Sequence, residues 1–144
     1  MIALDSSVVI ACFGGWHEHH QVARALLARR PSLPAHAALE SYSVLTRLPD
    51  PFRAGPSVAA EFLKRTFPAP RLVLDPPDYQ ALPGQLAELG ISGGAVCDAM
   101  IALTAQRAEA ELITLDRRAR DTYRRVGVPA RLLAGEVPPQ REPI

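Results

Sequence analysis

Short continuous apolar runs alternate along this chain with longer stretches in which apolar residues recur at helical spacing. The run at 112–115 is of the first kind, whereas Val22, Ala25 and Leu26 belong to the second. The pattern predicts strands at 1–4, 32–35, 72–74, 112–115 and 130–133. It predicts helices at 8–13, 18–30, 36–48, 56–67, 77–89, 95–110 and 117–126. This alternation predicts an α/β fold, with a parallel sheet of about five strands covered by helices on both faces.

Capping and helix-breaking residues refine the limits of these elements. Ser6 and Ser7 offer a cap for the first helix. Pro83-Gly84 is expected to kink or split the helix at 77–89, because proline lacks the N–H that a helix interior needs. The helix at 95–110 is expected to be the longest in the chain.

A chain of 144 residues has room for one domain with a substantial core. That domain is predicted at 1–134, and the Pro-rich segment at 135–144 is expected to be a flexible tail. The net charge is only +1, so any nucleic-acid surface must be a local patch. Cys12 and Cys97 are too few for a disulfide scaffold and are expected to be buried, reduced thiols.

The apolar N-terminal stretch lacks the features of a signal peptide. Asp5 interrupts it, and no lysine or arginine precedes it. No apolar run reaches the length of a transmembrane helix. We therefore expect a cytoplasmic protein with no membrane association.

Three acidic residues stand where a purely structural role is hard to assign. Asp5 and Asp116 each follow a predicted strand, at the sheet edge where α/β folds form their crevice. Asp98 shares the apolar face of its helix with Ile101 and Ala102. A carboxylate on a core-facing stripe is costly unless it is paired or binds a metal. The helix dipole contributes only about 0.3–1 kcal/mol, which does not offset that cost.

Glu40 lies in the first turns of its predicted helix, and its pattern leaves a solvent-exposed role equally open. Carboxylates that converge without lysines suit a hard divalent cation such as Mg²⁺, with Mn²⁺ as the alternative. Such an ion orients a phosphate and activates water for in-line attack.

Four sequence blocks then resemble the PIN-domain nucleases, in particular the stand-alone VapC-type toxins. The blocks are Met1-Ile2-Ala3-Leu4-Asp5-Ser6-Ser7, Ala38-Leu39-Glu40, the run from Gly90 to Ala102, and Leu112-Ile113-Thr114-Leu115-Asp116-Arg117-Arg118. They occur in family-like order and spacing, and the resemblance runs from Met1 to about Leu133. It implies a PIN-like three-layer α/β/α sandwich.

The resemblance also implies a site and partners. The implied catalytic and metal-binding residues are Asp5, Glu40, Asp98 and Asp116, with Ser7 and Thr114 in supporting positions. The implied reaction is Mg²⁺-dependent cleavage of RNA that leaves a 5′-phosphate and a 3′-hydroxyl. The implied partners are a second copy of the chain, in a homodimer, and a VapB-like antitoxin that covers the active site.

Some features keep alternatives open. Arg117, Arg118 and Arg120 either hold RNA phosphates beside the acids or form a solvated helix face. His17, His19 and His20 lack the spacing of a helical zinc site, so an exposed helix start is expected there. The alternative function is a non-catalytic module on the same fold that binds RNA or an antitoxin.

Overall fold

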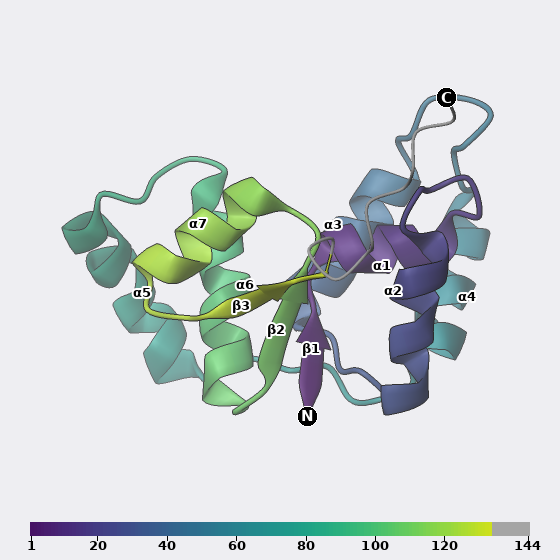
Figure 1. Ribbon diagram of the computed structural model, residues 1–144. Helices are drawn as coiled ribbons and strands as arrows, with labels where there is room; N and C mark the ends of the chain where they lie inside the picture. Colours follow the sequence, from purple (N-terminus) through teal and green to yellow (C-terminus); the bar gives the residue numbers. More distant parts are fainter. Residues whose placement is uncertain (134–144) are drawn as a thin grey trace, which may run out of the picture.

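The computed structural model describes residues 1–133, which fold around a parallel sheet (Figure 1). The sheet contains β1 (Ile2–Leu4), β2 (Glu111–Thr114) and β3 (Ala130–Leu132), in the order β1-β2-β3. Leu4 pairs with Ile113, and Thr114 pairs with Leu132. The tail predicted at 135–144, and Ala134 at the end of the predicted domain, lie outside the described residues.

The expected five strands are reduced to three within residues 1–133. The predicted strands at 32–35 and 72–74 form only isolated bridges, Ala3 to Ser32 and Pro34 to Leu72. Prolines at 31, 34 and 70 carry no N–H, so the segments cannot build a continuous ladder. The bridges still extend the sheet on the far side of β1. β1 therefore has the bridging segment at Ser32 on one side and β2 on the other.

Seven α-helices and one 3₁₀ helix surround this sheet in the described residues. They are α1 (Ser6–Phe13), α2 (His20–Ala25), the 3₁₀ helix η1 (Leu26–Arg29), α3 (Ala35–Leu45), α4 (Pro56–Thr66), α5 (Pro76–Leu89), α6 (Ala95–Arg107) and α7 (Arg117–Arg125). The prediction of an α/β fold with helices on both faces is confirmed. Among residues 1–133, no helix is both long enough and apolar enough to span a membrane.

Three helix predictions were wrong in detail. The helix expected at 18–30 divides into α2 and η1. α3 ends early, at Leu45, where the hydroxyl of Thr46 donates to the carbonyl of Ser43 at 3.2 Å and so satisfies a carbonyl of the last turn. α5 is neither split nor shorter than α6; it has 14 residues against 13. Pro83 lies on its exposed face, where water can solvate the carbonyl that loses its partner.

Each face of the sheet packs against its own group of helices, which gives the predicted three layers (Figure 1). Side chains alternate between the faces along a strand, so Leu4 packs with α1 and α4 whereas Ala3 packs with α6 and α7. Both faces are dry, as expected of a parallel sheet. β1 and β2 are neighbours at the centre. The bridging segments that follow β1 in the chain lie on one side of it, whereas β2 and β3 lie on the other side. The carboxyl ends of β1 and β2 form the switch point at which such folds bind ligands.

Candidate active site

Asp5 lies at the end of β1 and is almost fully buried, with 2% of its surface exposed. It caps α1: Oδ1 accepts from the backbone N–H of Ser7 at 3.1 Å and of Val8 at 3.4 Å. The cap is therefore Asp5 itself, not Ser6 or Ser7 as expected. Oδ2 accepts from the hydroxyl of Tyr123 at 2.8 Å. Burial raises the pKa of Asp5, whereas the hydrogen bonds from Ser7, Thr114, Tyr123 and Val8 lower it.

Ser7 and Thr114 join the ends of the two central strands. The Ser7 hydroxyl donates to Asp5 and accepts from the N–H of Leu115 at 2.8 Å. It lies 3.4 Å from the Thr114 hydroxyl, which in turn accepts from the N–H of Asp116 at 3.0 Å. This chain of contacts holds the two aspartates that follow β1 and β2 in a fixed relation.

Asp116 is the N-cap of α7 and is exposed. Its Oδ1 accepts from the N–H of Arg118 at 2.9 Å and of Ala119 at 3.2 Å. Its Oδ2 forms no hydrogen bond within residues 1–133. One oxygen thus fixes the side chain of an exposed residue and leaves the other without a hydrogen bond in the described part of the chain.

Glu40 reaches the same region from α3 and is half-buried rather than solvated. Its Oε1 accepts a hydrogen bond from Ser6, the residue that follows Asp5. Its Oε2 lies 3.8 Å from Nε2 of His36, one turn earlier on α3. The contact with Ser6 brings Glu40 to the N-terminus of α1, next to Asp5.

Asp98 lies in the first turn of α6 and is half-buried. Its neighbours Ile101, Ala102 and Ala105 are buried, as the apolar stripe predicted. Burial raises the pKa of Asp98 to about 6, and the charges of Glu40, Asp116 and Asp5 contribute to the rise in that order. The structure therefore brings all four predicted acids into one electrostatic site, contributed by β1, α3, α6 and β2.

Within residues 1–133, no lysine or arginine forms an ion pair with this site. The ion pairs formed within residues 1–133 leave all four acids without a lysine or arginine partner, and only His36 lies near Glu40. Within the same residues, Asp98 forms no hydrogen bond or ion pair at all. Oxygen donors with uncompensated negative charge suit a hard divalent ion. The donor set fits Mg²⁺ or Mn²⁺, with Asp5, Asp98, Glu40 and Asp116 as the residues that would hold it.

The acids are not packed as tightly as the ligands of an all-protein metal cage. Among residues 1–133, the one group of three His, Cys, Asp or Glu ligand atoms within 4.8 Å of one another is His36, Glu40 and Cys97. Mg²⁺ usually keeps several of its waters and needs only one or two direct carboxylates. The wider spacing of the acids is compatible with such an ion.

An open depression of about 400 Å³ adjoins the acids on the side of Ser7 and Asp116. Its remaining lining residues are Ile10, His17, Glu18, His19, Leu115 and Arg117. Burial, with the charge of His19, lowers the pKa of His17, so a neutral imidazole faces the depression near pH 7. The spacing of His17 and His19 in the sequence did not predict that they lie beside the acids, because the turn after α1 brings them there.

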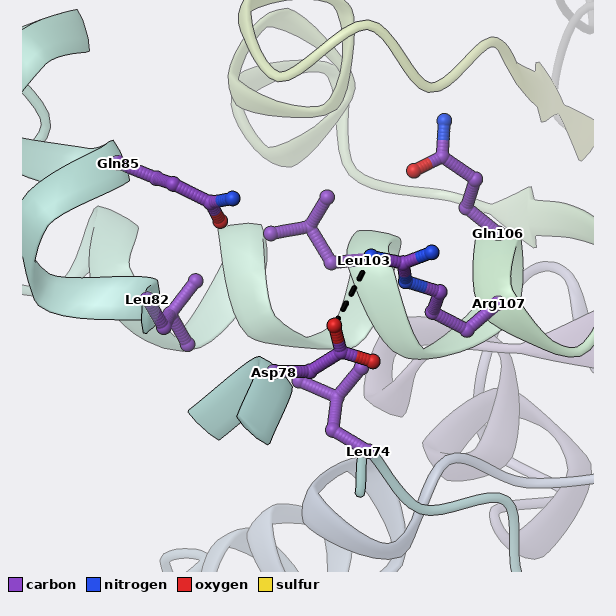
Figure 2. Close-up of a pocket in the computed structure, with 7 residues that line it drawn as sticks. All are labelled: Leu74, Asp78, Leu82, Gln85, Leu103, Gln106 and Arg107. Atoms are coloured by element: carbon purple, nitrogen blue, oxygen red, sulfur yellow. Dashed lines mark hydrogen bonds and ion pairs between the residues drawn. The ribbon is translucent and has the colours of Figure 1, made fainter. Parts of the chain in front are cut away.

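A second, smaller pocket of about 100 Å³ lies between α5 and α6, and none of the four acids lines it (Figure 2). Arg107 and Asp78 form an ion pair of 2.9 Å across it. This pair joins α5 to the C-terminal part of α6, far along the helix from Asp98. The pocket is structural and lies outside the acidic site.

The three arginines of α7 do not share one environment. Arg117 and Arg118 are exposed, and Arg117 lines the depression beside Asp116. Arg120 is half-buried and its Nε donates to the carbonyl of Ala130 at 3.2 Å. Arg120 therefore attaches α7 to β3, and only the first two are placed to meet a substrate.

Comparison with known proteins gives a consistent result. A model of the PIN domain matches residues 2–125, a span that contains all four acids. Ribonuclease VapC40 of Mycobacterium tuberculosis is 45% identical over 133 residues, which cover 92% of this chain and 99% of that protein. Ribonuclease VapC27 of the same organism is 45% identical over 128 residues, 88% of this chain and 93% of that protein.

The first prediction concerns the cost of the Asp98 charge. In EDTA, Asp98→Asn should raise the melting temperature at pH 7–8, because it removes a charge that the folded state disfavours. The pKa of Asp98 rises from 3.8 in the unfolded chain to about 6 in the folded chain. Below this pH window the carboxyl is protonated in both states. The gain in stability of Asp98→Asn over wild type should therefore be complete above about pH 6 and should vanish as the pH falls toward 3.8.

Circular dichroism melts across pH 4–8 check this, with Asp78→Asn as the control that loses a charge in an ion pair. If Asp98 were instead one half of a buried ion pair, removing it would cost about 3–5 kcal/mol. A melting temperature that falls by many degrees would show that outcome.

Proposed function

This chain belongs to the PIN-domain family, and on that premise we propose that it is a Mg²⁺-dependent endoribonuclease that acts as the toxin of a VapBC-type toxin–antitoxin pair. The observation that carries the proposal is a group of four acids, Asp98 and three neighbours, that has no lysine or arginine partner in residues 1–133. The names of its relatives support RNA as the substrate. Mn²⁺ is the alternative ion.

We assign each of the four acids a role at the proposed metal ion. Asp5, held by Ser7 and Tyr123, and Asp98 would hold the ion, because Asp5 is buried, and Asp98 is half-buried with no other partner among residues 1–133. Glu40, fixed by Ser6, and Asp116, fixed by the first turn of α7, would flank it. When bound, the ion supplies the charge that orients the scissile phosphate and activates a water for in-line attack.

The depression beside Asp116 would receive the RNA strand. Arg117 lines it and Arg118 is exposed next to it, so their guanidinium groups can bind phosphates on either side of the scissile bond. His17 and His19 offer rings that can stack on or hydrogen-bond to bases. Arg120 has a structural task at β3 and is not needed for this contact.

We propose two protein partners for this chain. One is a second copy of the chain, in a homodimer. The other is a VapB-like antitoxin, which would restrain the toxin. Exposed apolar side chains support such partners: Leu39 and Val58 have 66% and 58% of their surfaces exposed. Val58 and Phe62 line an open depression of about 570 Å³ along α4, which suits an apolar segment of another chain.

The alternative is a non-catalytic module on the same fold that binds RNA or the antitoxin. Such a module has no use for an ion, and the repulsion around Asp98 would then be a cost without a benefit. A metal titration therefore separates the two functions: the nuclease binds Mg²⁺ or Mn²⁺ through the acids, and the module does not.

The second prediction is that the purified chain cleaves RNA with Mg²⁺ or Mn²⁺. EDTA should stop the cleavage, and Asp98→Asn should reduce it by at least about a hundredfold because a ligand of the reacting centre is removed. Gel analysis of a structured RNA pool measures both effects. Cleavage that persists in EDTA would contradict the mechanism.

As an extension of the second prediction, RNA binding by the same purified chain tests the arginines. The double variant Arg117→Ala with Arg118→Ala should bind RNA more weakly than wild type. The salt dependence of its binding should flatten by roughly one unit of slope for each phosphate that the variant no longer neutralises. Arg124→Ala, at an exposed site on the same helix, is the matched control. If RNA binding had the same salt dependence in both variants, Arg117 and Arg118 would not bind RNA phosphates and α7 would present only a solvated face.

The third prediction is that expression of the chain without a partner arrests bacterial growth, whereas expression of Asp98→Asn does not. Co-expression of the cognate antitoxin should restore growth, and the two proteins should co-purify. Growth that continues while the chain is folded and cuts RNA in vitro would refute the toxin proposal.

A further inference from the structure

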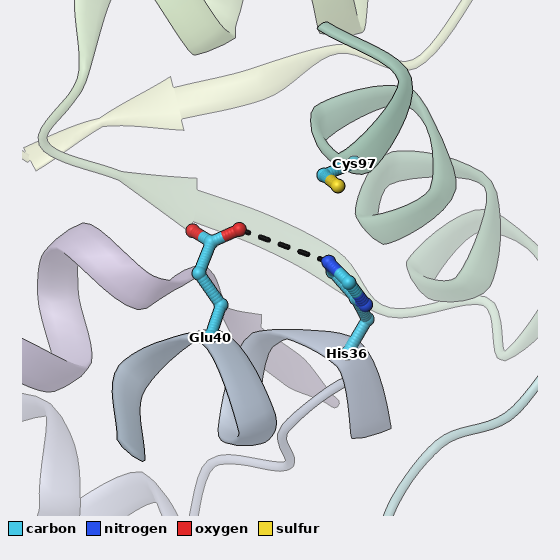
Figure 3. Close-up of side chains that lie close together, drawn as sticks. All are labelled: His36, Glu40 and Cys97. Carbon is cyan, nitrogen blue, oxygen red and sulfur yellow. Dashed lines mark ion pairs between the residues drawn. The ribbon is translucent and has the colours of Figure 1, made fainter. Parts of the chain in front are cut away.

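His36, Glu40 and Cys97 converge at the edge of the acidic site, and neither cysteine spacing nor histidine spacing predicted this. His36 and Glu40 lie four residues apart on α3, so they share one helix face. Cys97 comes from the first turn of α6, and its sulfur points toward the other two side chains (Figure 3). The potential ligand atoms of the three residues all lie within 4.8 Å of one another.

We propose that these three residues form a second metal site, which takes a borderline-soft transition ion such as Zn²⁺ and draws Glu40 away from the carboxylates when it is occupied. An imidazole nitrogen, a thiolate and a carboxylate oxygen are all ligand types that zinc accepts in proteins. Water would fill the fourth position. Mg²⁺ does not favour sulfur or nitrogen ligands, so the site selects against the ion of the nuclease.

The geometry requires only side-chain adjustments. Zinc bonds of about 2.0–2.3 Å place tetrahedral ligand atoms roughly 3.3–3.7 Å apart. The separation between His36 Nε2 and Glu40 Oε2 is already 3.8 Å. The Cys97 sulfur lies within 4.8 Å of the other two ligand atoms, so it has to approach them by no more than about 1 Å. A rotamer adjustment at this half-buried side chain allows such a shift.

An ion can also reach the site from solvent. The side chains of His36 and Glu40 are 28% and 29% exposed. On binding, the sulfur–hydrogen bond of Cys97 breaks, its proton passes to water, and the metal–sulfur bond forms. The charges of Glu40 and Asp98 act on Cys97, and these two carboxylates attract a dication to the site.

Glu40 connects this site to the acids. Its Oε1 faces Ser6 and the Asp5 side, whereas its Oε2 faces His36. Capture of Oε2 by an ion beside Cys97 would pull the carboxylate from Ser6, so Zn²⁺ should inhibit RNA cleavage at concentrations where Mg²⁺ is saturating. This consequence rests on the proposed nuclease function, but binding of the ion does not.

The fourth prediction is measured by titration of the metal-free full chain with Co²⁺ and then with Zn²⁺. Co²⁺ should produce a sulfur-to-cobalt charge-transfer band in the near ultraviolet, and Zn²⁺ should remove it at a one-to-one ratio. Cys97→Ser should abolish the band. His36→Ala should weaken binding at least about tenfold, since even outer-shell partners of a metal contribute that much. Excess Mg²⁺ should leave the band in place.

Cys12→Ala is the matched thiol control, because Cys12 is fully buried in the core and cannot reach an ion. It should keep the band. A wild-type chain without the band, or a band that survives in Cys97→Ser, overturns the proposal. Should Cys12→Ala fail to fold, the comparison of Cys97→Ser with wild type still decides the assignment.

The inhibition is then tested on RNA cleavage. With saturating Mg²⁺, Zn²⁺ should inhibit wild type at least about tenfold more strongly than Cys97→Ser, whose activity without Zn²⁺ should match that of wild type. Equal inhibition of both would mean that Zn²⁺ acts at the carboxylates alone and would overturn the regulatory step. A cobalt band in a chain that cuts no RNA would leave the metal site intact and refute the nuclease.

Discussion

The partial burial of a carboxylate among other carboxylates, not neutralised by any lysine or arginine of residues 1–133, is the constraint on which this site depends. Burial on α6 raises the pKa of Asp98 to about 6, and the charges of Glu40, Asp116 and Asp5 contribute to the rise. The fold tolerates this because each of the other acids is fixed by ordinary hydrogen bonds. Asp5 and Asp116 cap α1 and α7, and Ser6 fixes Glu40. Local helix chemistry therefore assembles a charge cluster that a bound cation would relieve.

The sheet supplies the positions that make this possible. The segments at Ser32 and Leu72 extend the sheet on one side of β1, and the chain then returns to place β2 on the other side. β1 and β2 are therefore neighbours. The aspartates after these strands thus meet at the switch point, and Ser7 bridges the two strand ends through Asp5 and Leu115. Glu40 extends the site toward α3, where His36 and Cys97 give it a second, softer set of ligands. One carboxylate would then be shared by the two ions that we propose.

Local sequence pattern predicted the features that it controls and missed those that depend on residues distant in the chain. The placement of Asp5 and Asp116 after strands, and of Asp98 on an apolar stripe, followed from periodicity alone. Glu40 could not be assigned from pattern, because its position depends on Ser6. The convergence of His36 with Cys97 leaves no spacing signal, since the two residues come from different helices. Of the kink or split expected at Pro83, the split is wrong, because α5 continues through a proline that lies on its exposed face.

Titration of the Asp98 carboxyl carbon by NMR, in the metal-free chain and with saturating Mg²⁺, tests the role of this carboxylate most directly. We predict a pKa of about 6 without the ion, because burial and three neighbouring charges oppose ionisation. We predict a marked fall in that pKa when Mg²⁺ is present, because the ion stabilises the carboxylate. An Asp98 whose pKa stays near the ordinary value of 3.8 and does not respond to Mg²⁺ would contradict this role.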